Sequence, residues 1–330
     1  MSAAGGAPLP AAGGEGRPGP VLEARGVAMR FGGLQALAAF DLRLEPRELV
    51  GLIGPNGAGK TTAFNAITGV YAPTAGEVRV CGARVNGQRP HDICARGVAR
   101  TFQNIRLFKE LSALDNVRVA CHLGARAGWA AALALTGGFL RDEARLTRRA
   151  GEFLAVMGLS HRSGEIARNL PYGEQRRLEI ARALATGPKV LCLDEPAAGM
   201  NASEKVALME LIRKIRDDFG LAILVIEHDM RLVMGVSERL VVLDHGVTIA
   251  RGTPEAVRRD PKVIEAYLGD SYLEERHISV PDDPGGARKS VPDDREKPAD
   301  DREKPVQEPE KPAEKPVPDD QSDDQSGRKA

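Results

Sequence analysis

A glycine-rich loop constrains the fold of this chain more than any other feature. Residues 54–62 read G-P-N-G-A-G-K-T-T, directly after the apolar run 49–53 and directly before a run with helical spacing. Glycines allow a loop to turn so tightly that consecutive backbone N–H groups and the N-terminus of the next helix face one anion. The order of strand, glycine loop and helix therefore predicts a phosphate-binding loop in an α/β fold.

The polar side chains of this loop indicate what it binds. In such loops the lysine, here Lys60, places its charge on the β- and γ-phosphates of a nucleotide, and the next hydroxyl, here Thr61, ligates Mg²⁺. We therefore expect a nucleotide and Mg²⁺ as cofactors. The expected nucleotide contacts in the loop are Gly54, Pro55, Asn56, Gly57, Ala58, Gly59, Lys60, Thr61 and Thr62.

Composition limits the other classes of function. With 330 residues, 42% of them hydrophobic, the chain can bury one substantial core. Lys and Arg total 46, as do Asp and Glu, so the overall charge does not indicate a nucleic-acid partner. The four cysteines form no C-x-x-C pair, which is typical of reduced thiols in a cytosol. We expect no signal peptide and no spanning helix, because the longest apolar run, 129–135, is far shorter than a bilayer requires.

The order of segments predicts one structured domain between two disordered ends. Residues 1–20 are rich in Ala, Gly and Pro, and residues 279–330 are charged and Pro-rich, so neither end can bury a core. Between them, over 21–278, continuous apolar strands alternate with helices, which favours a parallel sheet covered on both faces. The spacing of apolar residues is helical from about 105 to 169, and we interpret this part as an insertion in the α/β core.

A second set of polar residues follows predicted strands. Asp194 and Glu195 come directly after the apolar run 190–193, where an aspartate can hold Mg²⁺ through water and a glutamate can polarise the attacking water. Gln103 and His228 also follow strand-like runs, and the carboxyl ends of parallel strands meet at one edge of a sheet. We therefore expect Glu195, His228 and Gln103 to be catalytic, and the metal ligands to be Thr61, Gln103 and Asp194.

Phe31 is a candidate contact for the base of the nucleotide. It ends the first predicted strand and is followed by two glycines. An aromatic ring in this place can stack on an adenine face, whereas packing in the core is the alternative. The position alone does not decide between them.

Taken in order, these motifs resemble those of the nucleotide-binding subunit of an ABC transporter, over residues 21 to about 270. They are an aromatic A-loop residue (Phe31), Walker A (54–62), the Q-loop (Gln103), the signature L-P-Y-G-E-Q (170–175), Walker B (190–195), the D-loop (198–201) and the switch histidine (His228). The runs R-F-G-G-L-Q-A-L, R-T-F-Q-N-I-R-L-F and V-I-E-A-Y-L-G further resemble the ATPases of branched-chain amino-acid importers.

The resemblance implies more than the residues do by themselves. It implies a P-loop NTPase core, with a mostly parallel sheet flanked by helices, an antiparallel β subdomain and an ABC-type helical insertion at about 105–169. An importer-type C-terminal segment would lie at about 254–270. The implied activity is ATP hydrolysis that energises uptake through two membrane permease subunits, with a substrate-binding protein outside the membrane. The chain would then lie at the cytoplasmic face of the cell membrane.

One departure from the family pattern concerns the signature. In L-S-G-G-Q, the serine hydroxyl and backbone amides contact the γ-phosphate bound to the opposite subunit of an ATPase dimer. Here Pro171 and Tyr172 stand at the Ser-Gly places and Glu174 at the Gln place. Gly173, Glu174 and the start of the next helix remain the expected contacts, through backbone amides. A sibling ATPase with a fuller signature, in a heterodimer, would compensate.

Two alternative functions stay open on the sequence. Similar ATPases serve lipopolysaccharide export, and no motif here excludes that role. Soluble ATPases of this fold act in translation or DNA repair, but they typically carry two such domains or a long coiled coil. A single phosphate loop and no heptad array count against that second alternative.

Overall fold

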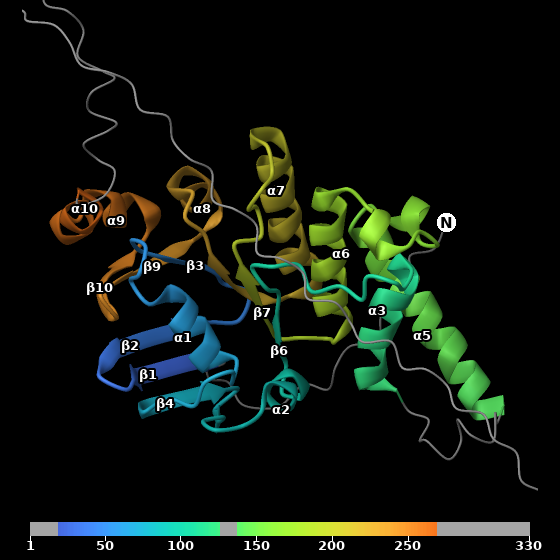
Figure 1. Ribbon diagram of the computed structural model, residues 1–330, viewed down its shortest axis with the longest axis horizontal. Helices are drawn as coiled ribbons and strands as arrows, with labels where there is room; N and C mark the ends of the chain where they lie inside the picture. The colour runs from blue at the N-terminus through green and yellow to red at the C-terminus, as the bar shows by residue number, and fades with distance from the viewer. Residues whose placement is uncertain (1–18, 126–136, 269–330) are drawn as a thin grey trace, which may run out of the picture. The chain divides into compact units, whose positions relative to one another are not determined.

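The computed structural model describes residues 19–125 and 137–268 (Figure 1). Three segments discussed above lie outside the described residues: the predicted leader up to residue 18, the apolar run 129–135 and the charged tail 279–330. The helical spacing predicts two helices, over Trp129–Leu140 and Glu143–Met157, and the structure has one continuous helix over Gly137–Val156. All elements below belong to this described part of the chain.

Five parallel strands form one half of the sheet. In spatial order they are β9 (Arg239–Asp244), β3 (Leu49–Ile53), β8 (Ala222–Ile226), β7 (Val190–Asp194) and β6 (Val98–Arg100). Every residue of the strands β3, β7 and β8 is buried. Continuous apolar runs of this kind are expected in a parallel sheet that is covered on both faces.

The two faces of strand β3 contribute to different parts of the core. Val50 and Leu52 pack in a cluster with the antiparallel strands and α1 (Lys60–Ile67). Leu49 and Ile53 pack in a second cluster with the helices of the other side. Because side chains alternate along a strand, one apolar strand joins both clusters and anchors the loop that follows it.

Antiparallel strands form the other half of the sheet. They are β1 (Leu22–Phe31), β2 (Leu34–Leu44), β4 (Ala75–Val80) and β5 (Ala83–Arg84). The strand β10 (Val247–Gly252) joins the halves, because it runs antiparallel to β9 and pairs with β2 through Val247 and Ala39. The predicted antiparallel subdomain is therefore continuous with the parallel half in one ten-stranded sheet.

Helices cover the parallel half and extend beyond its edge (Figure 1). Besides α1, they are α2 (Pro90–Ala95), α3 (Ala113–Cys121), α5 (Gly137–Val156), α6 (Tyr172–Ala185), α7 (Ala202–Phe219), α8 (Met230–Val236), α9 (Pro254–Arg259) and α10 (Pro261–Leu268). Single 3₁₀ turns occur at His122–Gly124, Ser160–Arg162 and Ala167–Asn169. The sequence predicts one helix through Tyr267, but the structure has two, α9 and α10. The chain turns at Asp260 and restarts at a proline, which lacks the N–H needed inside a helix.

The helical insertion is closed where it leaves and rejoins the core. Its helices α3 and α5 pack against each other and against α6, on the side of the sheet edge formed by β6 (Figure 1). The entering and returning segments lie side by side, with Ser112 bridged to Ile166 and the Ala167 N–H donating to the Leu111 carbonyl. The insertion therefore starts and ends at one place, close to the segment that carries Gln103.

Candidate functional site

The register of four parallel strands brings the motif residues to one edge of the sheet. Leu52 of β3 lies opposite Ile226 of β8, and Ile226 lies opposite Asp194 of β7. Arg100 of β6 lies opposite Cys192 in the same strand as Asp194. The segments that follow these strands, which carry the glycine loop, His228, Glu195 and Gln103, therefore leave the sheet together, as predicted.

The backbone of the loop admits only glycine at two positions. Gly54 has φ 152°, and a Cβ there would collide with the carbonyl oxygen of Leu243. Gly59 has φ 98°, and a Cβ there would lie 2.6 Å from the carbonyl oxygen of Ala36. Gly59 is also the N-cap of α1 and makes no side-chain cap bond, so the first N–H groups of the helix are left to an anion.

Lys60 is held over the loop by two backbone carbonyls. Its ammonium donates to the carbonyl oxygens of Gly54 and Pro55, at 2.7 and 2.8 Å. Burial lowers the pKa of Lys60, and the negative charge of Glu195 partly opposes that shift. The lysine charge and the Glu195 carboxylate therefore act within the same site.

Asp194 is paired with an arginine that the sequence analysis did not identify. The Arg100 Nη2 lies 2.9 Å from Oδ2 of Asp194, and both side chains are at least nine-tenths buried. Burial raises the pKa of Asp194, while the Arg100 guanidinium lowers it. Arg100 Nη1 also donates to Asn65, which lies in α1, and to Thr68, the C-cap of that helix. The sequence offers one indication of this ion pair, which is a charged residue, Arg100, in an otherwise apolar strand before Gln103.

Glu195, Gln103 and His228 meet at one carboxylate oxygen. Gln103 Nε2 donates to Glu195 Oε2 at 3.2 Å, and His228 Nδ1 lies 3.7 Å from the same oxygen. Glu195 has φ 46°, in the left-handed region, and its N–H donates to the Ile226 carbonyl at 3.0 Å. This conformation is uncommon for a non-glycine residue. The three predicted catalytic side chains therefore lie together, with Glu195 in the middle.

The donor set fits Mg²⁺ bound chiefly through phosphate and water. Thr61 lies exposed in the first turn of α1. Of the two carboxylate oxygens of Asp194, only Oδ2 accepts a hydrogen bond from the described residues, so Oδ1 is available to a metal ion. Over 19–125 and 137–268, no three His, Cys, Asp or Glu side chains cluster as a cage. Mg²⁺ typically takes only one or two protein ligands beside phosphate oxygens and water.

Phe31 lies on the surface rather than in the core. Its side chain is 43% exposed, and its ring makes an edge-to-face contact with Tyr71, with centroids 5.2 Å apart. The alternative of core packing is therefore wrong. Stacking on an adenine ring stays a prediction.

The signature residues lie apart from the glycine loop within this chain. Gly173 and Glu174 line a hollow of about 320 Å³ with residues of α7, and no residue of 54–62 lines it. The Glu174 carboxylate turns to Arg162, at 3.1 Å. Pro171 is the N-cap of α6, and its carbonyl accepts the N–H of Glu174. The hollow beside the signature is therefore separate from the glycine loop.

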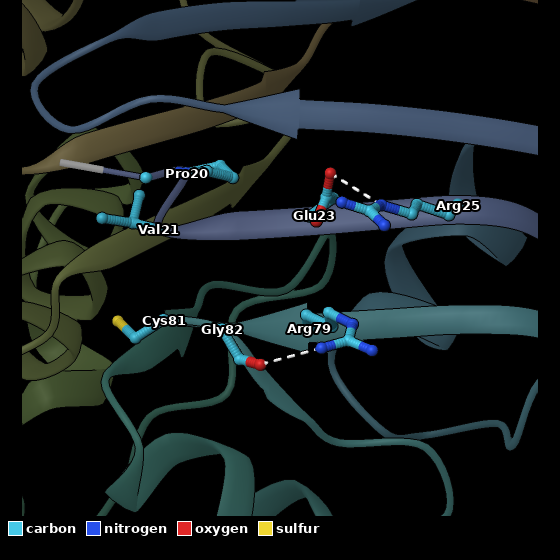
Figure 2. Close-up of a pocket in the computed structure, with 8 residues that line it drawn as sticks. Pro20, Val21, Glu23, Arg25, Arg79, Cys81 and Gly82 are labelled. Atoms are coloured by element: carbon cyan, nitrogen blue, oxygen red, sulfur yellow. Dashed lines mark hydrogen bonds and ion pairs between the residues drawn. The ribbon is translucent and has the colours of Figure 1, made fainter. Parts of the chain in front are cut away.

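A separate hollow of about 440 Å³ lies on the antiparallel strands β1 and β4 (Figure 2). Glu23 and Arg25 form an ion pair at 2.8 Å on β1, and Arg79 donates to the Gly82 carbonyl at 3.2 Å beside it. None of the motif residues lines this hollow. It is therefore not part of the candidate site.

The fold and this site define a P-loop nucleotide-binding protein. The model of the ABC transporter family matches residues 37–198, and the model of the branched-chain amino acid ATP-binding cassette transporter family matches residues 247–272. The chain is 47% identical to the branched-chain amino acid transport ATP-binding proteins BraF of Pseudomonas aeruginosa and LivG of Escherichia coli. Each match spans 252 residues, which is 76% of this chain and 99% of the relative.

More distant matches agree with this assignment. The lipopolysaccharide export ATP-binding protein LptB of Escherichia coli is 31% identical, over 76% of this chain and 98% of LptB. The crystal structure of an ATP-binding cassette of an ABC transporter in its ADP conformation has a TM-score of 0.66. It is 28% identical and covers 76% of this chain and 99% of that one. The chain belongs to the ATP-binding proteins of ABC transporters, and it is an ATPase.

The comparisons confirm the recognised family, the P-loop α/β fold and the prediction of an ATP-hydrolysing subunit of an ABC importer. The export-type relative LptB is less similar to this chain than BraF of Pseudomonas aeruginosa and LivG of Escherichia coli are, so the export alternative is less supported. In the part of the chain that the structure describes, no helix is both long and apolar enough to cross a membrane.

Proposed function

We propose that this chain energises the uptake of branched-chain or related neutral amino acids through partner permeases. The observation that carries the proposal is the 47% identity, over almost their full length, to proteins named for branched-chain amino acid transport. The match of residues 247–272 to the branched-chain cassette family supports it independently. A substrate-binding protein outside the membrane would select the amino acid.

Each residue of the site has a role in this proposal. Thr61, Gln103 and Asp194 would hold Mg²⁺, which would neutralise charge on the phosphates when bound. Lys60 and the amides of the glycine loop bind the phosphates, and Phe31 stacks on the adenine. Glu195 accepts a proton from the attacking water, because its carboxylate is the group on which the neighbouring polar side chains converge.

Gln103 and His228 orient that reaction in our proposal. Gln103 Nε2 donates to Glu195 Oε2, and this hydrogen bond fixes the orientation of the carboxylate. His228 lies 3.7 Å from that oxygen and is half-exposed, which leaves its ring free to reach a γ-phosphate oxygen. Both side chains would therefore lie between the Glu195 carboxylate and the γ-phosphate.

Two ATPase subunits complete the sites. The first N–H groups of α6, up to that of Gly173, would contact the γ-phosphate on the opposite subunit. The Glu174 N–H donates to the Pro171 carbonyl, so Glu174 would contribute to this contact through its place in the first turn of α6. A sibling ATPase is the proposed partner, because Pro171 carries no hydroxyl and no N–H at the signature.

The permease subunits would dock beside the segment that carries Gln103. A hollow of about 860 Å³ lies there between α2, α3 and α6. The exposed Phe108 and Val119 give its wall an apolar surface, and Arg106 and Arg182 stack on the rings of Phe102 and Phe108. Docking at this hollow would hold the chain at the cytoplasmic face of the cell membrane.

Uptake by cells tests the proposed cargo. A strain that lacks this chain is complemented with the wild type, with Lys60→Ala or with Lys214→Ala, and the uptake of radiolabelled leucine is measured. Lys214 lies on the exposed face of α7, 67% exposed, and serves as the matched control. We expect uptake with the wild type and Lys214→Ala and none with Lys60→Ala. Leucine uptake that is equal in all strains would overturn the proposed cargo.

A further inference from the structure

Tyr172 connects the start of α6 to a buried arginine. It is the first residue of the helix, and its hydroxyl oxygen accepts from Nη2 and Nε of Arg176, at 2.9 and 3.2 Å. The two residues are four positions apart, so they lie on one face of the helix. The Arg176 guanidinium also stacks on the tyrosine ring, 5.4 Å from its centroid.

Arg176 in turn holds the backbone of the segment that carries Gln103. Its side chain is only 3% exposed, and its guanidinium donates to the carbonyl oxygens of Phe102, at 2.7 Å, and of Gln103. Glu179 compensates the buried charge at 3.4 Å and also accepts the Arg106 N–H. Buried cations are stable only when they are paired and hydrogen-bonded in this way. The tyrosine oxygen is therefore one member of a buried polar network that fixes the Gln103 segment.

The Tyr172 ring also lies against Gly199. Gly199 has φ 75°, and a Cβ there would lie 3.0 Å from Cε1 and 3.4 Å from Cζ of the tyrosine. Gly199 belongs to the turn that begins at Glu195, where the Ala198 N–H donates to the Glu195 carbonyl at 3.2 Å. The ring thus covers a glycine four residues after the carboxylate that we propose as the base.

Glu195 is therefore reached from Tyr172 by two routes. One runs through Arg176 to the Gln103 backbone, and the Gln103 side chain donates to Glu195 Oε2. The other runs through Gly199 along the turn that follows Glu195. Both routes start at the first residue of α6, whose N–H groups are the proposed contact for a nucleotide on the opposite subunit.

We propose that Tyr172 is a positioning residue for ATP hydrolysis. It holds the first turn of α6, the Gln103 segment and the Gly199 turn in one arrangement, so that the Glu195 carboxylate keeps its direction while α6 meets the second nucleotide. This role rests on the proposed function of Glu195. Tyr172 is 45% exposed and is not part of either apolar core cluster, so substitution of this residue leaves both clusters intact.

Kinetics of the assembled transporter test this proposal. Tyr172→Phe keeps the ring on Gly199 and removes the oxygen that Arg176 binds, whereas Tyr172→Ala removes both. We expect kcat for ATP to fall about tenfold in Tyr172→Phe, as loss of a hydrogen bond to a charged group produces, and further in Tyr172→Ala. KM for ATP should stay within about twofold of the wild type, because the glycine loop is untouched. The urea midpoint of each full chain is measured in parallel.

The outcomes separate this proposal from the proposed function. A lower kcat in Tyr172→Phe at unchanged KM and unchanged urea midpoint supports the positioning role. Wild-type kcat in Tyr172→Phe overturns it, and so does a loss of activity that only follows a loss of folded protein. Turnover by the wild-type complex and its loss in Lys60→Ala test the proposed function in separate samples.

Discussion

Arg100 and Asp194 form a buried ion pair between adjacent strands, with Arg100 Nη2 2.9 Å from Asp194 Oδ2. The same guanidinium donates to Asn65 and Thr68, so it ties the helix behind the glycine loop to the strand that presents the proposed metal ligand. The rings of Phe64 and Phe102 both lie close to this guanidinium, with their centroids 5.4 and 5.2 Å from Cζ. The position of the Asp194 carboxylate is thus set by a residue that no sequence motif includes.

Loss of this arginine should destabilise the chain strongly. Arg100→Met leaves the buried Asp194 carboxylate without its partner, and we expect the free energy of unfolding in urea at pH 7 to fall by about 3–5 kcal/mol. The double variant Arg100→Met with Asp194→Asn should recover much of this loss. Arg89→Met is the matched control, because the pair of Arg89 with Asp92 is largely exposed and contributes little. A loss in Arg100→Met as small as that of the control would contradict the structural role.

Burial of Glu227 should make stability depend on pH. Glu227 is buried, its Oε1 accepts the Ala197 N–H at 3.0 Å, and burial raises the pKa of its carboxyl. The folded chain then binds this proton more readily than the unfolded chain. The contribution of Glu227 to stability therefore falls as pH rises through the interval that begins near 4.5, the ordinary pKa of Glu, and ends at the raised pKa.

A substitution separates this effect from other titrations. Glu227→Gln keeps an oxygen that accepts the Ala197 N–H and removes the charge. We expect a higher free energy of unfolding than the wild type at pH 8, and a difference that shrinks as pH falls to 4.5. Glu210→Gln, at an exposed position of α7, should leave the free energy of unfolding unchanged at both pH 8 and pH 4.5. A Glu227→Gln variant that is less stable than the wild type at pH 8 would show that the charge itself is needed.

The signature predicts weak activity of this chain alone. Pro171 provides neither hydroxyl nor N–H, and the Tyr172 oxygen is engaged by Arg176, so two copies of this chain would lack the serine contact at both sites. A hydrogen bond to a charged phosphate is worth roughly tenfold or more in affinity. We expect ATPase activity of the isolated chain to rise at least about tenfold when the sibling ATPase and permeases are added. Full activity of the chain by itself would refute the heterodimer.

The strands of the parallel half could be predicted closely because burial on both faces leaves a simple pattern. The apolar runs at 49–53 and 222–226 coincide with β3 and β8. The apolar pattern predicts a strand only over Phe40–Leu44, whereas β2 starts at Leu34, because the first residues of β2 are exposed or only partly buried. Helix α8 was not predicted, since its seven residues are too few to show a helical period, although Asp229 caps its N-terminus.

The residues of the candidate site that follow strand ends could be predicted from the sequence. The contacts between side chains that are distant in the sequence could not. Gln103, Glu195 and His228 were expected together because parallel strands end at one edge, and they lie together. The partnership of Arg100 with Asp194 joins residues 94 positions apart, and no spacing rule indicates it. The contact of Tyr172 with Gly199 depends on how α6 packs against the 198–201 turn, which the sequence does not encode locally.

The most direct measurement is ATP turnover by the assembled transporter with Glu195→Gln in this chain. The substitution keeps the shape of the side chain and its contact with Gln103, but it removes the charge that would accept a proton from water. Glu110→Gln, at an exposed position, is the matched control. We predict that kcat falls at least about 10²-fold in Glu195→Gln while ATP still binds, and that the control is unchanged. Near-normal hydrolysis by Glu195→Gln would contradict the assignment of Glu195 as the base.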